Sequence, residues 1–236
     1  MHSRPMPKPS RRRLSSDERR LGIVNAVLAL AGEHGPDAVT TQAIADRIGV
    51  TQGALFRHFP DKEAMWLAVF DWVRTALDAA VDAAIDPEAP PLANLERAFC
   101  AHVGLVAAHP GVPRALYHEL QTVGDSRVRA AVRAMVGDYR RRLLRLFEQA
   151  KVAGELPLQL DAALATVLFI GAVQGLVIQA ALAGGSASLE KRAQPMFALL
   201  LDGYRGGRGR PRRATRAATR TSPAVPRATR RSRDAG

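Results

Sequence analysis

Residues 50–62 hold a short run of side chains whose types and spacing suit contact with a polyanion. The run reads VTQGALFRHFPDK and places apolar Leu55 and Phe59 four residues apart on one side of a helix, with polar or very small residues at Gln52, Gly53, Ala54 and His58. A helix this short is not stable alone, so it must rest on neighbouring helices through its apolar side. A helix that enters the DNA major groove needs such support together with a free polar side.

Three positions of this run predict particular contacts. The Gln52 amide can bond bidentately to adenine, which is worth about 1–3 kcal/mol of discrimination; a solvated first-turn residue is the alternative. Gly53 costs a helix about 1 kcal/mol relative to alanine, which indicates close backbone approach, and Ala54 beside it leaves a bare surface for a thymine methyl group. Lys62 opposes the dipole of the helix that it begins, and a phosphate contact would explain it better than an accidental surface position.

The other polar positions allow two interpretations each. Thr41 and Thr51 are expected as helix N-caps (Thr40 can cap in place of Thr41), and a phosphate contact near each hydroxyl is as consistent with the sequence as capping alone. His58 can donate to a phosphate or a base edge, or cap a short helix. Arg57 is a phosphate contact or a solvated charge.

Helix signals surround this run in the first 85 residues. Ser15 and Glu18 form a capping-box pattern, and Gly49 is a C-terminal stop signal. The apolar periodicity predicts helices at about 15–35, 40–48, 51–58 and 62–85. Four apolar side chains are assigned to the core of this part: Ile44, Ile48, Leu55 and Phe59.

The remainder of the chain also predicts helices only. Five stretches between Pro and Gly breakers have helical periodicity, at about 92–108, 112–122, 126–153, 161–183 and 188–204. Pro195 inside the last stretch is expected to kink it or to mark its true start. No alternating strand pattern of useful length is present, so the predicted fold class is all-α.

Charge is concentrated at the two ends of the chain. The formal net charge is +12, of which residues 1–16 contribute +5 and residues 206–236 contribute +9, leaving −2 for residues 17–205. Basic arms on a near-neutral body favour a polyanionic partner, nucleic acid before membrane, although a solubilising tail would have the same composition. One cysteine, Cys100, excludes an internal disulfide and fits a reducing compartment. No signal peptide is readable, so a cytoplasmic location is expected.

The run from Ile23 to Val69 resembles the N-terminal domain of the TetR family of bacterial transcriptional regulators. The resemblance lies in TQAIA at 41–45, GVTQGALF at 49–56 and HFPDKE at 58–63. It implies a helix-turn-helix whose second helix reads DNA. Many family members carry tyrosine where this chain has Phe56, so Phe56 is left with an apolar contact or a packing role.

The composition of the two ends and the resemblance together predict a division of the chain. We expect a disordered basic arm (1–14), a helix-turn-helix DNA-binding domain (15–62), a connecting helix (63–85), a helical ligand-binding and dimerisation domain (86–205) and a disordered arginine-rich tail (206–236). The helices at 161–183 and 188–204 resemble the pair through which family members form homodimers. The first of these reaches transmembrane length, but its amides Gln174 and Gln179 favour a buried helix at an interface.

The family resemblance implies that some polar residues of the C-terminal domain line an effector cavity, although each also fits a satisfied interior or surface position. The candidates are His102, Tyr117, His118, Tyr139 and Gln174. The histidines lack metal-ligand spacing, and no nucleophile-base-acid arrangement or phosphate loop stands out. No metal, cofactor or catalytic activity is therefore predicted.

The arginine-rich tail contains an Arg-Gly-Arg-Pro segment that resembles the AT-hook, an extended element of A·T minor grooves. The arginines concerned are Arg208, Arg210, Arg212 and Arg213. Attraction to phosphates without sequence preference is the simpler alternative.

Together these patterns predict a homodimeric, ligand-responsive DNA-binding regulator. A repressor that a small molecule releases from a palindromic operator is the preferred interpretation, with no membrane involvement. The alternatives are a nucleoid or architectural DNA-binding protein that uses its basic arms, a ligand-dependent activator, and a small-molecule-binding module or enzyme without DNA activity.

Overall fold

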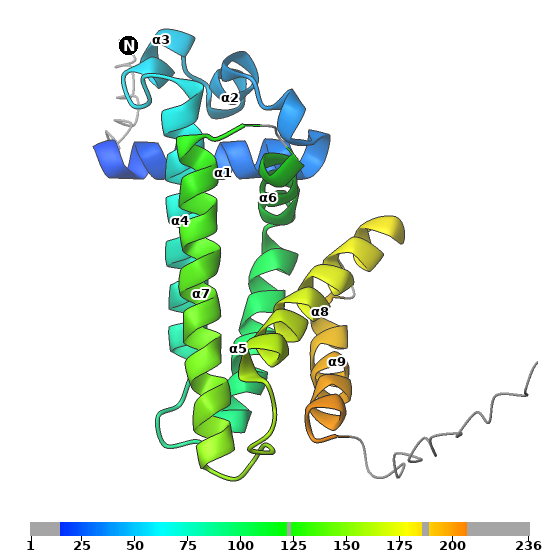
Figure 1. Ribbon diagram of the computed structural model, residues 1–236. Coiled ribbons are helices and arrows are strands. Elements are labelled where there is room, and N and C mark those ends of the chain that lie inside the picture. Colours follow the sequence, from blue (N-terminus) through cyan, green and yellow to red (C-terminus); the bar gives the residue numbers. More distant parts are fainter. Residues whose placement is uncertain (1–14, 122–123, 186–188, 207–236) are drawn as a thin grey trace, which may run out of the picture.

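The computed structural model describes residues 15–121, 124–185 and 189–206, and within these ranges it contains helices and no strand (Figure 1). The prediction of an all-α fold is confirmed. The helices are α1 (Ser16–His34), a 3-10 turn η1 (Pro36–Ala38), α2 (Thr41–Ile48), α3 (Gln52–Phe56), α4 (Lys62–Ala84), α5 (Pro91–Ala108), α6 (Gly111–Gln121), α7 (Arg127–Val152), α8 (Ala162–Leu182) and α9 (Leu189–Tyr204).

The helix ends follow from local chemistry. At the start of α1, the Ser15 hydroxyl accepts from the Glu18 backbone N–H at 3.1 Å and the Glu18 carboxylate accepts from the Ser15 N–H at 2.7 Å, which is the predicted capping box. Gly49 ends α2 with φ +69°, a left-handed conformation that glycine adopts without strain. Side-chain caps thus satisfy backbone groups that helix ends leave open.

Two predicted boundaries differ from the structure. Helix α3 ends at Phe56, because Arg57 and His58 form a turn, so it is shorter than the predicted 51–58. Pro195 lies inside α9, so it does not mark the start of that helix. A proline within a helix removes one backbone donor and clashes with the preceding turn, yet α9 continues to Tyr204.

The helices enclose two hydrophobic clusters. The first cluster joins α1, α2 and α3 to the N-terminal half of α4, to α6 and to the start of α7. The second joins the C-terminal end of α4 and most of α7 to α5, α8 and α9, with Phe99, Phe169 and Phe197 in mutual ring contact. Helices α4 and α7 lie side by side and run through both clusters (Figure 1). A displacement of either helix in one cluster therefore also moves side chains in the other cluster, because the interior is close-packed.

Helix α8 is apolar on the side that faces solvent as well as on its packed side. By length and composition it is the one helix in the described ranges that could cross a membrane, with a mean hydropathy of 1.9, and 33% of its most apolar stretch is buried. Phe169 and Val173 are buried, whereas Leu164 and Leu168 are exposed. The prediction of a buried helix therefore holds for one side of α8 within this single chain.

Candidate nucleic-acid interface and effector cavity

Helix α3 has only five residues, and contacts at its start and along one side fix it to the rest of the protein. The Thr51 hydroxyl caps its first turn by accepting from the Ala54 backbone N–H at 3.2 Å. Leu55 and Phe59 are each 2% exposed in the first hydrophobic cluster. These contacts supply the support that the sequence demanded for so short a helix.

The outward side of α3 is exposed and largely free of internal bonds. Gln52, Gly53 and Arg57 are exposed. Phe56 is 45% exposed, so it does not belong to the core. A Cβ atom built on Gly53 would meet nothing within 4 Å. The fold therefore gives no steric reason for a glycine at this position, and the close approach of DNA stays a prediction.

Thr40, rather than Thr41, caps α2. The Thr40 hydroxyl accepts from the Ala43 backbone N–H at 3.1 Å, so the expectation of a cap at Thr41 is wrong. Thr41 is the first residue inside α2, and its hydroxyl accepts from the Gln52 side-chain amide at 3.4 Å. This long bond places Gln52 beside the start of α2, where backbone N–H groups are also open to an anion.

Two exposed cations near α3 have no ion-pair partner among the described residues. They are Arg57, directly after α3, and Lys62, the first residue of α4. The cap of α4 is supplied by Asp61, whose carboxylate accepts from the Ala64 N–H at 2.7 Å. Since Lys62 neither caps nor pairs, its charge remains available to a phosphate.

Arg47 shows the opposite behaviour. Its guanidinium donates two bonds of 2.6 Å to the Glu33 carboxylate and thereby joins α2 to α1. The hydrogen bond from Arg47 lowers the pKa of Glu33. Arg47 therefore has a structural partner already, although it lies close to the predicted DNA-binding side chains in sequence.

Arg20 is a residue that the sequence did not indicate. Its guanidinium donates to the backbone carbonyl of His58 at 2.8 Å and lies 4.4 Å from the centre of the Phe59 ring. It thus holds the turn after α3 against α1, and His58, which is half-buried, sits in that turn. Thirty-eight residues separate the bonded pair, so no local pattern could reveal the contact.

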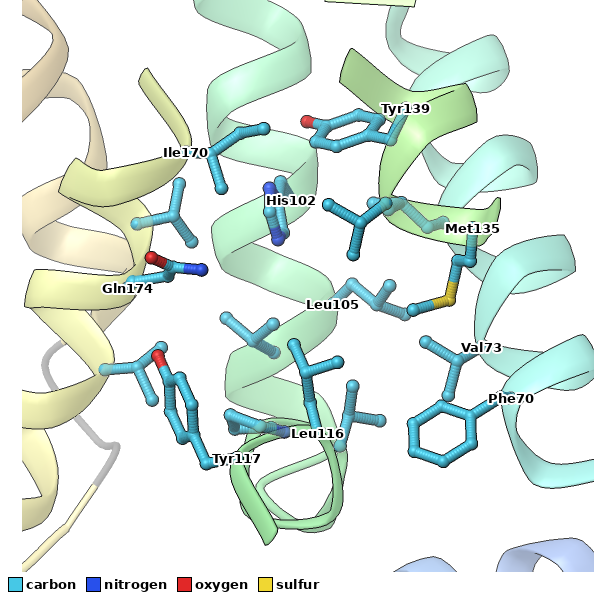
Figure 2. Close-up of a pocket in the computed structure, with 17 residues that line it drawn as sticks. Phe70, Val73, His102, Leu105, Leu116, Tyr117, Met135, Tyr139, Ile170 and Gln174 are labelled. Atoms are coloured by element: carbon cyan, nitrogen blue, oxygen red, sulfur yellow. The ribbon is translucent and has the colours of Figure 1, made fainter. Parts of the chain in front are cut away.

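A cavity of about 90 Å³ lies at the junction of α4, α5, α6, α7 and α8 (Figure 2). Most of the 17 lining residues are apolar, and none is Asp, Glu, Lys or Arg. Four of the five predicted effector-site residues are in its wall: His102, Tyr117, Tyr139 and Gln174. Helices distant in sequence therefore bring these four side chains around one space.

The polar groups of this wall are neutral at pH 7. Burial lowers the pKa of His102 to about 4 and raises the pKa of Tyr117 and Tyr139. Among the described residues, the Tyr139 hydroxyl and the Nδ1 atom of His102 are buried without a hydrogen-bond partner. Leaving such a group unpaired costs about 1–3 kcal/mol. The rings of His102 and Tyr139 lie edge to face, with their centres 5.1 Å apart.

His118 does not line the cavity. It follows Tyr117 in α6, so its side chain points about a quarter turn away around the helix. Its ring lies 3.8 Å from the Asp37 carboxylate of η1, on the side of the first hydrophobic cluster. The prediction of His118 as a cavity residue is therefore wrong, because polarity alone does not tell which side of α6 faces inward.

Helix α6 joins the cavity to α1. Its inner side contributes Val112 and Tyr117 to the cavity wall, while Gly111 packs directly on α1. A Cβ atom on Gly111 would lie 1.9 Å from the Leu28 carbonyl oxygen, so no other residue fits there without displacement. Arg114 adds a bond of 2.8 Å to the Gly32 carbonyl.

An exposed apolar surface covers the outer side of α8 and part of α9. We refer to it as the α8–α9 face. Its members are Leu164, Val167, Leu168, Ile178, Leu182 and Leu199, which are between 47% and 77% exposed. Large apolar patches are uncommon on the surface of monomers.

The predicted tail contacts Arg208, Arg210, Arg212 and Arg213 lie outside the described residues, as do residues 1–14. The AT-hook resemblance therefore stays a prediction.

Two family models match the chain. "Bacterial regulatory proteins, tetR family" matches residues 23–69, and "Tetracyclin repressor-like, C-terminal domain" matches residues 120–196. Nucleoid occlusion factor SlmA of Shewanella amazonensis is 22% identical over 161 residues, which cover 68% of this chain and 82% of that protein.

Solved structures share the fold. The fatty acid degradation regulator FadR from Bacillus halodurans has a TM-score of 0.71 at 21% identity, covering 79% of this chain and 96% of that one. AibR in complex with isovaleryl coenzyme A and operator DNA has a TM-score of 0.65 at 22% identity, covering 78% of this chain and 98% of that one. At these identities the likeness establishes a common architecture.

Proposed function

This chain belongs to the TetR family of bacterial regulatory proteins, and from that premise we propose that it is a homodimeric repressor released from a palindromic operator by a small molecule. The observation that carries the proposal is the double role of α4 and α6. Both helices line the cavity, and both pack in the cluster that holds α1, α2 and α3. A molecule that fills the cavity therefore acts on helices that also position the DNA-binding elements.

The proposed DNA contacts divide into base readers and phosphate contacts. Gln52 reads an adenine edge, and the bare surface of Gly53 and Ala54 lies against a thymine methyl group. Thr41, Thr51 and the exposed cations Arg57 and Lys62 contact phosphates, which fixes the register. Two further residues complete the proposed surface, Phe56 through an apolar contact and His58 at the edge of the groove.

The α8–α9 face supports the proposed homodimer. Leu164, Leu182 and Leu199 are 65%, 77% and 69% exposed in the single chain, and burying such side chains contributes about 1.5–3 kcal/mol each. A two-fold contact through this face would place two α3 helices on one side of the DNA, so the operator is expected to be a near-palindrome.

The proposed release mechanism is a shift between two dimer conformations. The cavity of about 90 Å³ is smaller than a drug-sized ligand requires, so an effector must move the surrounding helices outward. Movement of α4 and of α6 against α1 would alter the separation of the two α3 helices. The effector then binds the conformation that fits DNA poorly, and DNA and effector weaken each other's binding.

Footprinting on genomic fragments, with and without a metabolite extract, tests the proposal. The expected result is a protected near-palindrome that the extract releases. Gln52→Ala combined with Lys62→Ala should abolish protection, whereas the exposed control pair Gln149→Ala and Arg145→Ala on α7 should not. Operator binding that survives the first pair would contradict the proposed reading surface. The absence of any protected site with the wild-type chain would favour a module without DNA activity. Protection that the extract strengthens would favour a ligand-dependent activator.

A nucleoid-associated role is the second candidate function. It is favoured by the similarity to nucleoid occlusion factor SlmA and by the basic ends of the chain. Such a protein would bind at many sites, and binding that uses the arms alone would show little base preference. Uniform protection along the fragments, insensitive to the Gln52→Ala substitution, would support this alternative.

A further inference from the structure

The effector cavity has a wall whose composition limits what it can bind. Apolar side chains from five helices form most of the wall, and the free space is about 90 Å³. A dry apolar cavity of about 150 Å³ in another protein admits benzene. A compact molecule with a six-membered ring therefore enters here with a small outward shift of the helices, and its body must be apolar.

Polar groups converge at one part of this wall. Figure 2 shows the His102 ring between Gln174 of α8 and Tyr139 of α7, with the Gln174 amide pointing toward it. Tyr139 is only 5% exposed, and its hydroxyl has no hydrogen-bond partner in the described part of the chain. Buried polar groups are nearly always bonded. An unpartnered donor at the wall of a cavity thus points to an acceptor that arrives with a ligand.

No wall residue carries a charge to balance that of a ligand. The wall lacks acidic and basic side chains, and burial keeps its histidine and both of its tyrosines neutral. An ionised group placed there would lose its hydration without gaining a counter-charge. A neutral oxygen can instead accept from Tyr139 and from the Gln174 amide.

We propose that the effector is a small neutral molecule with an apolar ring-sized body and one hydroxyl or carbonyl oxygen, which Tyr139, Gln174 and His102 bind. This inference rests on the proposed function, because it assigns a chemical class to the effector of that regulator. The proposed effector differs in chemical class from the ligand of AibR, whose structure was solved with isovaleryl coenzyme A. Coenzyme A carries phosphates, and the wall offers them no cation.

Calorimetric titration of the full chain with matched probes tests the chemical class. The probes are cyclohexanone, cyclohexanol, cyclohexane, cyclohexanecarboxylate and isovaleryl coenzyme A. We expect the two oxygenated neutral probes to bind about tenfold more tightly than cyclohexane, as one recovered hydrogen bond implies. The carboxylate should bind at least about a hundredfold more weakly than cyclohexanone. The inference would be overturned if the carboxylate or the coenzyme A ester bound more tightly than cyclohexanone. It would also be overturned if neither oxygenated probe bound.

Two tyrosine variants locate the bound oxygen. Tyr139→Phe removes a hydroxyl without an internal partner and should weaken cyclohexanone about tenfold while leaving cyclohexane unchanged. Tyr204→Phe is the control, because its buried hydroxyl donates to the Ala165 carbonyl at 2.9 Å outside the cavity. Equal effects of the two variants would contradict the assignment. If Tyr139→Phe does not fold, as judged by its Tm, Gln174→Leu provides the same comparison.

Operator binding is measured separately on unliganded protein. Retained operator binding without any binding of the oxygenated probes would refute the effector class and leave the proposed regulator intact. If the unliganded protein does not bind an operator, but the probes bind in the expected order of affinity, the proposed regulator is refuted and the assigned cavity chemistry stands.

Discussion

Replacing Gly111 with alanine tests the contact through which α6 meets α1. The added Cβ atom would lie 1.9 Å from the Leu28 carbonyl oxygen, 2.9 Å from the Leu28 carbonyl carbon and 3.1 Å from the Gly32 nitrogen. All three atoms belong to the backbone of α1, so none can rotate away as a side chain would. The two helices must therefore separate by on the order of 1 Å, in a protein interior that is packed like a crystal.

The expected cost follows from that separation. Overpacking a well-packed contact costs about 1–3 kcal/mol, and the separation also strains the 2.8 Å bond from Arg114 to Gly32. Alanine gains up to about 1 kcal/mol over glycine inside a helix, but Gly111 is the first residue of α6, where this gain is small. We expect the free energy of unfolding to fall by about 2 kcal/mol.

Urea unfolding of the full chain measures this change, with Gly104→Ala as the control. Gly104 lies within α5, and a Cβ atom there meets nothing within 4 Å, so its replacement should raise the stability by up to about 1 kcal/mol. If Gly111→Ala unfolds at the same urea concentration as the wild type, and the free energy of unfolding falls with urea at the same slope, the close contact between α6 and α1 does not exist as described.

Three further predictions follow from the structure and a fourth from the arginine-rich sequence of residues 206–236. Gly53→Ala fills open space on α3, so it should raise the stability by up to about 1 kcal/mol yet lower DNA affinity about tenfold in fluorescence anisotropy; unchanged affinity would contradict a close approach of DNA. The His102 pKa of about 4 lies below its ordinary value of 6.5, so between pH 6.5 and 4 the unfolded chain binds a proton that the folded chain does not. Stability should therefore fall by up to about 3 kcal/mol as the pH drops through this window, and His102→Gln should reduce that loss in urea titrations; an identical pH dependence would refute the assignment. Leu168→Glu should convert the proposed dimer into monomers in sedimentation experiments, whereas Val152→Glu, at an 86% exposed position on α7, should not. Removal of residues 206–236 should lower DNA affinity generally and flatten its salt dependence, and an unchanged salt slope would argue against tail contacts.

The sequence by itself determined the features that depend on neighbours within one or two turns. The capping box of Ser15 and Glu18, the glycine stop at Gly49 and the cap at Thr51 all bond within a few residues, and the structure confirms each. The burial of Leu55 and Phe59 also followed from their spacing. Such interactions are fixed by local geometry, so residue type and spacing are enough to predict them.

Only the tertiary structure decided which segments meet. Helix periodicity did not show that Arg20 would hold the turn at His58, that Gly111 would touch Leu28, or that His118 would face away from the cavity that Tyr117 lines. Each of these results depends on the angle and distance at which two helices pack, and ridges and grooves allow several such arrangements for one sequence pattern. The sequence therefore predicts the DNA-reading residues, while the packing of α4, α5, α6, α7 and α8 creates the cavity and its connection to α1.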